Sequence, residues 1–242
     1  KRATDDVDSF GFDDGPRGVP AGADGRVFVH GAEGIGDAID LETGDRLWQV
    51  DTVSDYESPQ GFFGRACSPL VMGDRVIITP GGACDGKPAG VVALEAKSGK
   101  PLWQSVKDEA GYASPVAVGE DRLLCWMRNE VWLLNAADGG IVSHRPLRAG
   151  MEASVNAAQP VLLDGDRVAI SAGYGVGLHV LRLPDLEPLW SQQNLLDCHY
   201  SSPVREGERL FGFDGRQETG QTLRCIDLAK REVGWESGRV PG

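Results

Sequence analysis

The 242-residue sequence lacks the features of several large protein classes. It contains no apolar run near the roughly 18 residues that a membrane-spanning helix needs. Lys and Arg together number 24 against 36 Asp and Glu, which gives a net charge of −12. That balance argues against a nucleic-acid partner and against an anionic membrane surface. The five cysteines include no Cys-x-x-Cys and no adjacent pair, which excludes a zinc site built on paired cysteines.

Other metal and catalytic patterns are also missing. The four histidines have no metal-ligand spacing, and there is no GxSxG, HExxH or Asn-x-Ser/Thr. In the acidic segment 5–14, Phe10 stands where an EF-hand loop needs an oxygen ligand, so we interpret this segment as a solvated loop. Cys67 and Cys84 are the nearest cysteine pair. One disulfide between them stays open, with free thiols acting as small hydrophobic residues as the alternative. A catalytic site whose residues converge only in space also stays open.

The sequence is rich in glycine and proline, with 33 and 14 residues. These breakers favour many short strands joined by turns over a helical protein.

The chain also repeats itself. Tryptophans at 48, 103, 190 and 235 each follow a small or aliphatic residue by ten positions. Gly44 and Gly99 lie four residues before the first two tryptophans, in a Thr-Gly or Ser-Gly turn. Leu186 and Arg231 replace this glycine in the last two units. A fifth unit fits the same frame, with Gly139 in the turn and Ser143 where the tryptophan would be.

A second marker has the same period. Prolines at 20, 69, 115, 160 and 203 are each followed, six or seven residues later, by an arginine that opens a short apolar strand. Each unit therefore reads as four antiparallel strands, and the chain as about twenty. A repeat of four strands every 43–55 residues is typical of propeller blades. We expect a single all-β domain over residues 1–242, with blades at about 18–50, 66–105, 112–146, 157–192 and 200–237.

The tryptophans have a structural role in this prediction. A large flat ring fills the wedge between two neighbouring sheets, and the turn glycine leaves room for it. We therefore expect Trp48, Trp103, Trp190 and Trp235 to be core residues that dock between blades, with Gly44 and Gly99 in the receiving turns.

The pattern Ala-x-Asp-x-x-Thr-Gly-x-x-x-Trp at 38–48 resembles the tryptophan-docking repeat of the pyrroloquinoline-quinone (PQQ)-like β-propellers. The resemblance covers most of the chain and implies a propeller of seven or eight blades, of which five are visible. A closed five-bladed ring is the alternative. If further blades exist, the outer faces of the first and last units would be apolar, and the isolated chain would self-associate.

The resemblance leaves two functions open. The first is a non-catalytic, extracytoplasmic binding or scaffold propeller of the bacterial BamB type, in the periplasm or secreted. The alternative is a portion of a PQQ-dependent quinoprotein dehydrogenase, which implies PQQ and calcium. The sequence lacks the adjacent cysteines common in those enzymes, and we expect neither cofactor. Propeller ligands usually bind on the channel face, where a protein, small molecule or carbohydrate would meet loop and hairpin residues. The candidates are Tyr56, Phe62, Phe63, Arg65, Tyr174 and His199. The long loop 52–65 could instead plug a blade junction by aromatic packing.

Overall fold

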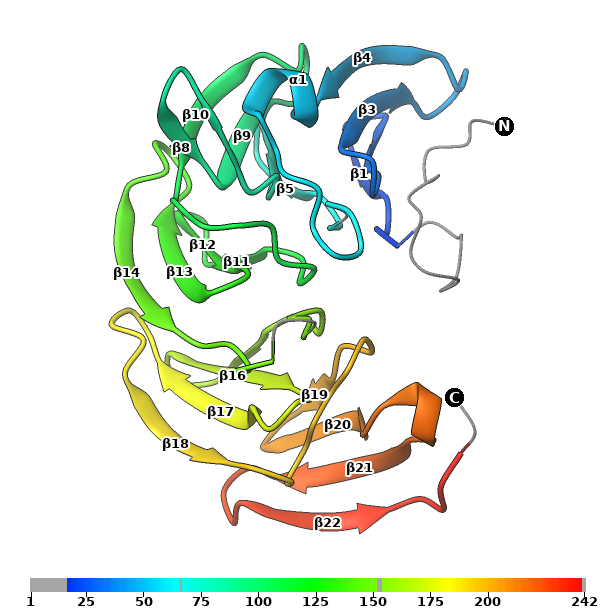
Figure 1. Cartoon of the computed structure of the whole chain (residues 1–242), viewed down its shortest axis with the longest axis vertical. Coiled ribbons are helices and arrows are strands. Elements are labelled where there is room, and N and C mark those ends of the chain that lie inside the picture. Colours follow the sequence, from blue (N-terminus) through cyan, green and yellow to red (C-terminus); the bar gives the residue numbers. More distant parts are fainter. Residues whose placement is uncertain (1–16, 66, 152–153, 241–242) are drawn as a thin grey trace. The chain divides into compact units, whose positions relative to one another are not determined.

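The computed structural model describes residues 17–65, 67–151 and 154–240 (Figure 1). Nearly all of their regular structure is β-strand, and the strands form five four-stranded antiparallel sheets and one two-stranded sheet. This confirms the predicted all-β architecture of four-stranded blades. Two short helices complete the described elements, α1 (Thr52–Tyr56) and the 3₁₀ helix η1 (Gln217–Thr219). No helix among the described residues reaches the length and apolarity that a membrane span requires.

The chain divides into two compact units, Lys1–Val142 and Ser143–Gly242. In the first unit, the strands of sheet one run in the order β1 (Ala21–Ala23), β2 (Arg26–His30), β3 (Ile35–Asp40) and β4 (Arg46–Asp51). Sheet two contains β5 (Leu70–Met72), β6 (Arg75–Ile78), β9 (Val91–Glu95) and β10 (Pro101–Ser105), and β7 (Gly82–Cys84) and β8 (Lys87–Ala89) form an inserted hairpin. Sheet three contains β11 (Val116–Val118), β12 (Arg122–Trp126), β13 (Glu130–Asn135) and β14 (Ile141–Pro146), and the unit boundary falls within β14.

The second unit holds the last two sheets, drawn from yellow-green to red in Figure 1. Sheet four contains β15 (Val161–Leu163), β16 (Arg167–Ala172), β17 (Gly177–Arg182) and β18 (Pro188–Gln192). Sheet five contains β19 (Val204–Glu206), β20 (Arg209–Asp214), β21 (Thr222–Asp227) and β22 (Glu232–Glu236). In both sheets the strand order follows the chain.

The repeat markers fall at equivalent places in the sheets. The marker arginine is the first residue of the second strand in all five sheets. The marker proline precedes the first strand; β11, for example, begins at Val116, directly after Pro115. Each docking tryptophan pairs across the sheet with the small residue ten positions earlier, as Trp48 does with Ala38, and a register shift follows that pair. The β7–β8 hairpin adds two strands to the predicted twenty.

Serine hydroxyls link neighbouring sheets at the residue before three of the five marker prolines, at Ser68, Ser114 and Ser202. Val19 N–H donates to Ser68 Oγ at 2.8 Å, and Ser68 N–H donates to Ser114 Oγ at 3.0 Å. In the second unit, Gln159 N–H donates to Ser202 Oγ at 2.9 Å. The hydroxyl of one blade thus accepts from the backbone of the blade before it, and this ladder adds a polar contact to the apolar packing between sheets.

The buried residues lie mainly on the second and third strands of each sheet, while the fourth strand is mostly exposed. In sheet three, Leu123, Leu124, Leu133 and Leu134 have no measurable exposure. All five cysteines are free thiols and four of them are buried, so no Cys67–Cys84 bridge is present. The acidic segment 5–14 lies outside the described residues.

Candidate functional site

Two tryptophans of the first unit dock on the next sheet in the same way. Trp48 Nε1 donates to the Ala96 carbonyl and Trp103 Nε1 donates to the Ala136 carbonyl, both at 3.0 Å. Each indole lies on the glycine of the receiving turn. An added Cβ would approach the Trp48 ring to 2.7 Å from Gly99, and the Trp103 ring to 2.5 Å from Gly139. Both glycines have φ near +70°, a conformation that other residues adopt at a cost.

In the second unit the docking residue or the turn residue that it contacts differs from this pattern, and the partner residue differs too. Ser143 has no ring, but its hydroxyl donates to the Pro184 carbonyl of the receiving turn. In that turn Leu186 takes the place of the glycine at φ +56° and is fully buried. Trp190 meets Arg231 instead of a glycine, with the guanidinium 5.5 Å from the ring centroid. Each change on the donor or receiving side is thus matched by its partner.

Trp235 and Gly44 depart from the expected docking. Trp235 is 46% exposed, so the expectation of a core residue does not hold for it. Phe211 supports the indole from within its own sheet, at a centroid distance of 6.1 Å. At Gly44 the backbone has the receiving conformation, with φ +76°, but an added Cβ would meet no described atom within 4 Å. Neither residue has a docking partner among the described residues.

The aromatic loop, residues 58–65, carries most of the candidates of the first unit. Phe62 is 47% exposed, and its ring lies edge-on to Phe63 at 4.7 Å. Phe63 is held in place: its N–H donates to Tyr112 Oη at 2.8 Å, and its carbonyl accepts from Arg17 Nη1 at 3.2 Å. The rings of Phe63 and Tyr112 also meet edge-on, with centroids 5.9 Å apart. The loop therefore presents one exposed phenylalanine on an anchored base.

Arg65 and Tyr56 support this loop from beneath. Arg65 is only 8% exposed; its Nε donates to the Ser58 carbonyl at 3.0 Å and its Nη1 to the Glu33 carbonyl at 3.4 Å. Burial lowers the pKa of Arg65, and the charge of Asp51 opposes that shift. Tyr56, in α1, is 3% exposed, and burial raises its pKa to about 12. Both were predicted to face a ligand, but the structure places them as buried supports.

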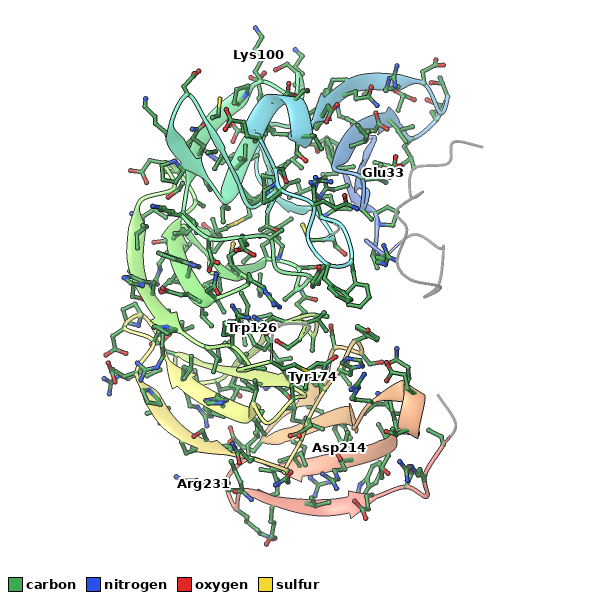
Figure 2. The ribbon with its side chains drawn as sticks, in the orientation of Figure 1. Glu33, Lys100, Trp126, Tyr174, Asp214 and Arg231 are labelled. Carbon is green, nitrogen blue, oxygen red and sulfur yellow. The ribbon has the colours of Figure 1, made fainter. Side chains whose placement is uncertain are left out.

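The second unit brings Tyr174 and His199 together, 25 residues apart in sequence. Tyr174 lies in the hairpin between β16 and β17 (Figure 2), and its Oη is 2.8 Å from His199 Nε2. His199 Nδ1 is 2.9 Å from Gln217 Oε1, an atom that can only accept. Nδ1 therefore carries the proton and Nε2 accepts from the tyrosine. Burial lowers the pKa of His199, which keeps the imidazole neutral at pH 7.

Two residues that sequence reasoning did not single out complete this group. The Tyr200 ring lies 3.9 Å from the His199 ring and is 38% exposed, while the Arg216 guanidinium lies 5.0 Å from the Tyr174 centroid. His199 is 1% exposed, so Tyr200, not His199, meets solvent. Tyr200 could have been predicted as a site residue from the sequence, because it directly follows His199 in the loop between two blades.

A buried Cys–His contact lies in the first unit. His30 Nδ1 is 3.8 Å from Cys67 Sγ, and Thr79 Oγ1 donates to the same sulfur at 3.0 Å. Burial raises the pKa of Cys67, and burial together with the charge of Arg65 lowers the pKa of His30 to about 4. Both groups are therefore neutral at pH 7, which is the opposite of a thiolate–imidazolium nucleophile.

The repeat geometry and the docking contacts agree with a comparison against protein families. A family model described as outer membrane protein assembly factor BamB matches residues 14–237. The chain belongs to this BamB-like family of PQQ repeats. The predicted family resemblance is thereby confirmed.

Solved structures of similar fold include a BamB protein and quinohemoprotein alcohol dehydrogenases. BamB from Moraxella catarrhalis aligns with a TM-score of 0.65 and 16% identity, covering 88% of this chain and 60% of that one. The quinohemoprotein alcohol dehydrogenase ADHIIG from Pseudomonas putida HK5 aligns with a TM-score of 0.67 and 16% identity, covering 90% and 52%. In sequence, 80 residues are 38% identical to the Pseudomonas putida enzyme ADH-IIG, which is 33% of this chain and 11% of the enzyme. The chain thus spans about half to three fifths of these solved BamB-like and dehydrogenase chains.

The dehydrogenase branch implies PQQ and calcium, which would need a cluster of metal-binding side chains and an open aromatic face. No three His, Cys, Asp or Glu side chains within this part of the chain gather closely enough to ligate a metal ion. The tryptophans outside the docking frame are Trp126 and Trp132, which are 0% and 7% exposed. Trp132 Nε1 donates to the Asp108 carboxylate at 3.1 Å. Neither ring offers an open face to a quinone.

Proposed function

We propose that this chain is a non-catalytic binding or scaffold propeller that acts outside the cytoplasm and holds a protein partner on its aromatic loop. The observation that carries the proposal is the exposed Phe62 on the anchored Phe63–Tyr112 base. An ordered loop loses little conformational entropy on binding, which favours affinity. Membership of the BamB-like family supports both the protein partner and the extracytoplasmic location.

Charge supports the same surface. The chain carries a net charge of −12, yet two arginines, Arg17 and Arg128, lie close enough to the Tyr112 hydroxyl for their charges to favour its ionised form, against one acidic residue, Glu109. Aromatic residues and arginine are enriched in protein interfaces and among their most important contacts. The cluster therefore has the composition of a protein-binding site within an acidic protein.

Site-specific photo-crosslinking tests the proposal. A photoreactive residue at position 62 should form one dominant protein adduct in the source cells, while one at position 102 should not. Leu102 is a suitable control because it is exposed to 46%, against 47% for Phe62. With the partner purified, Phe62→Ala should weaken binding about 30-fold, which corresponds to a loss of about 2 kcal/mol. Equal adducts at both positions, or unchanged affinity, would contradict the proposal.

The second candidate is a portion of a quinoprotein dehydrogenase, which the 38% identity over 80 residues favours. Adding PQQ and Ca²⁺ and recording the absorption spectrum and alcohol-dependent dye reduction separates the two functions. A binding propeller should show neither a bound-quinone spectrum nor dye reduction. Dye reduction that requires both additions would establish the dehydrogenase function instead.

A further inference from the structure

Three segments of the second unit meet around His199, which is buried. They are the hairpin with Tyr174 (Figure 2), the inter-blade loop with His199 and Tyr200, and the 3₁₀ helix η1. Hydrogen bonds at both nitrogens of His199 reach the hairpin and η1. The backbone adds a further tie, because Gly173 N–H donates to the Cys198 carbonyl at 3.0 Å. The side chains around His199 are thus held in place before any ligand binds, which lowers the entropy cost of binding.

Tyr200 forms an open platform on this base. Its ring centroid lies 3.9 Å from that of His199, with 31° between the two planes, so His199 covers one face of Tyr200. Tyr200 remains 38% exposed, against 1% for His199. The other face of Tyr200 is therefore open for stacking against an apolar face of a ligand.

Arg216 and Glu218 lie beside the platform as a donor and an acceptor. Arg216 Nη2 is 3.3 Å from Glu218 Oε1, and the two side chains are 45% and 32% exposed. Burial raises the pKa of Tyr200; the charge of Glu218 adds to this rise and that of Arg216 opposes it, which places both charged groups near the Tyr200 hydroxyl. The ion pair is neutral as a whole. The site therefore offers hydrogen bonds of both kinds without a net charge.

This combination favours a ligand that has hydroxyl groups around an apolar face. A hydroxyl can accept from the Arg216 guanidinium and donate to the Glu218 carboxylate. A proline-rich peptide also stacks on tyrosine, but proline has no N–H, so it would leave the Glu218 carboxylate without a donor from the ligand. A nucleotide would bring phosphate charges to a protein of net charge −12. A sugar ring has both the C–H face and the hydroxyls that the site requires.

We propose that Tyr200, Arg216 and Glu218 form a binding site for a neutral saccharide. A pyranose ring stacks through its C–H face on the open face of Tyr200, and its hydroxyls bond to Arg216 and Glu218. His199 does not touch the sugar; it is a positioning residue that supports the Tyr200 ring. The site shares no residue with the aromatic loop, so it goes beyond the proposed protein partner and is tested independently of it.

NMR titration of the full chain with neutral methyl glycosides tests the proposal. The probes are the methyl glycosides of glucose, galactose, mannose and N-acetylglucosamine. At least one should bind with a Kd of about 1 mM, the strength that ordinary ligand efficiency gives for one sugar ring. Saturation-transfer NMR should show the C–H face of that sugar against an aromatic ring of the protein. No binding of any probe at millimolar concentration would overturn the proposal.

Variants of the platform and of the acceptor locate the bound sugar. Tyr200→Ala should weaken binding at least about 10-fold, while Tyr200→Phe keeps the ring and should bind within about 2-fold of the wild type. Glu218→Ala should also weaken binding about 10-fold, as expected for a lost hydrogen bond to a charged group. Phe62→Ala is the matched control, because Phe62 is an aromatic residue of the first unit with 47% exposure, and its loss should leave glycoside binding unchanged. Binding that survives Tyr200→Ala would place the sugar elsewhere and overturn the proposal.

Two further probes separate the alternatives. A polyproline peptide should not bind at Tyr200, and binding of this peptide without binding of any glycoside would establish a peptide site instead. Comparing the bound methyl glycoside with the matching trisaccharide identifies the source of the sugar. Tighter binding of the trisaccharide is expected for a site that takes part of a glycan chain, and equal affinity for one that takes a free monosaccharide.

Discussion

Trp103 and Gly139 form a matched pair, because the indole lies where a side chain on residue 139 would begin. An added Cβ would lie 2.5 Å from the ring, and the glycine also has φ +70°. Trp48 and Gly99 repeat the relationship at 2.7 Å with φ +71°. Two separate conditions therefore require glycine at this position: the backbone has a left-handed φ, and the indole ring leaves no room for a Cβ atom.

Comparing Gly99→Ala with Gly44→Ala separates these two conditions. Both substitutions introduce a side chain at positive φ, which costs about 1–2 kcal/mol. Gly99→Ala also forces Cβ into the Trp48 ring, and overpacking of this kind costs about 1–3 kcal/mol. Gly99→Ala should therefore lower the free energy of unfolding by about 1–3 kcal/mol more than Gly44→Ala does. Urea unfolding at low protein concentration measures both, and equal losses would contradict the docking at Gly99.

Replacing Trp103 tests the value of the ring and of its hydrogen bond. Trp103 is partly buried against the core cluster, so Trp103→Ala should cost about 3 kcal/mol, the lower end of the range for emptying a buried aromatic site. Trp103→Phe keeps part of the ring but removes the donor to the Ala136 carbonyl, so it should cost less than Trp103→Ala. Trp235→Ala should cost less than either in the monomer, because that ring is 46% exposed. A neutral Trp103→Ala in urea unfolding would show that the assigned register is wrong.

Restoring the missing tryptophan at Ser143 should fail unless its partner changes too. Ser143→Trp alone inserts a ring where Leu186 is fully buried, which should destabilise the protein by about 1–3 kcal/mol. Ser143→Trp combined with Leu186→Gly should recover most of that loss, because glycine suits φ +56° and leaves room for the ring. A double-mutant cycle in urea measures the coupling between the two positions. Additive effects would show that the two residues do not share a site.

The architecture could be predicted from the sequence because its determinants recur at fixed spacing. The marker arginine, the turn glycine and the docking tryptophan lie in local frames of about ten residues, and each frame folds with its own neighbours. Such local signals are what sequence patterns report best. The exposure of Trp235 could not be predicted in this way, because it depends on the neighbouring sheet rather than on residues 225–235.

The candidate site was predictable only in part. The exposure of Phe62 and the anchoring of Phe63 depend on Tyr112, which is 49 residues away in sequence. Arg65 and His199 were expected on a ligand face, but backbone carbonyls and aromatic neighbours hold them inside, at 8% and 1% exposure. Polar residues in loops therefore indicated the right regions, while the direction of each side chain depended on distant hydrogen-bond partners.

Protonation of buried His30 should make the protein less stable in mild acid. His30 is 3% exposed, and its burial and the charge of Arg65 lower its pKa from 6.5 to about 4 in the folded state. Between these values the unfolded chain binds a proton that the folded chain does not, so stability rises with pH across this window. The contribution of His30 is complete above pH 6.5 and is lost as the pH falls toward 4. Its full size is about 3 kcal/mol, at about 1.4 kcal/mol per pH unit.

Urea unfolding of His30→Gln between pH 4.5 and 7 isolates this contribution from other titrating groups. The variant has no imidazole, so its free energy of unfolding should rise less steeply with pH than that of the wild type. The difference in slope should be at most about 1.4 kcal/mol per pH unit, the value for one proton. Burial also lowers the pKa of His179 and His199, so part of the wild-type slope should remain in the variant. His144→Gln is the matched control for the loss of a histidine, since His144 lies exposed on β14. If His30→Gln and His144→Gln have the same pH dependence as the wild type, His30 does not remain neutral in the folded protein at mildly acidic pH.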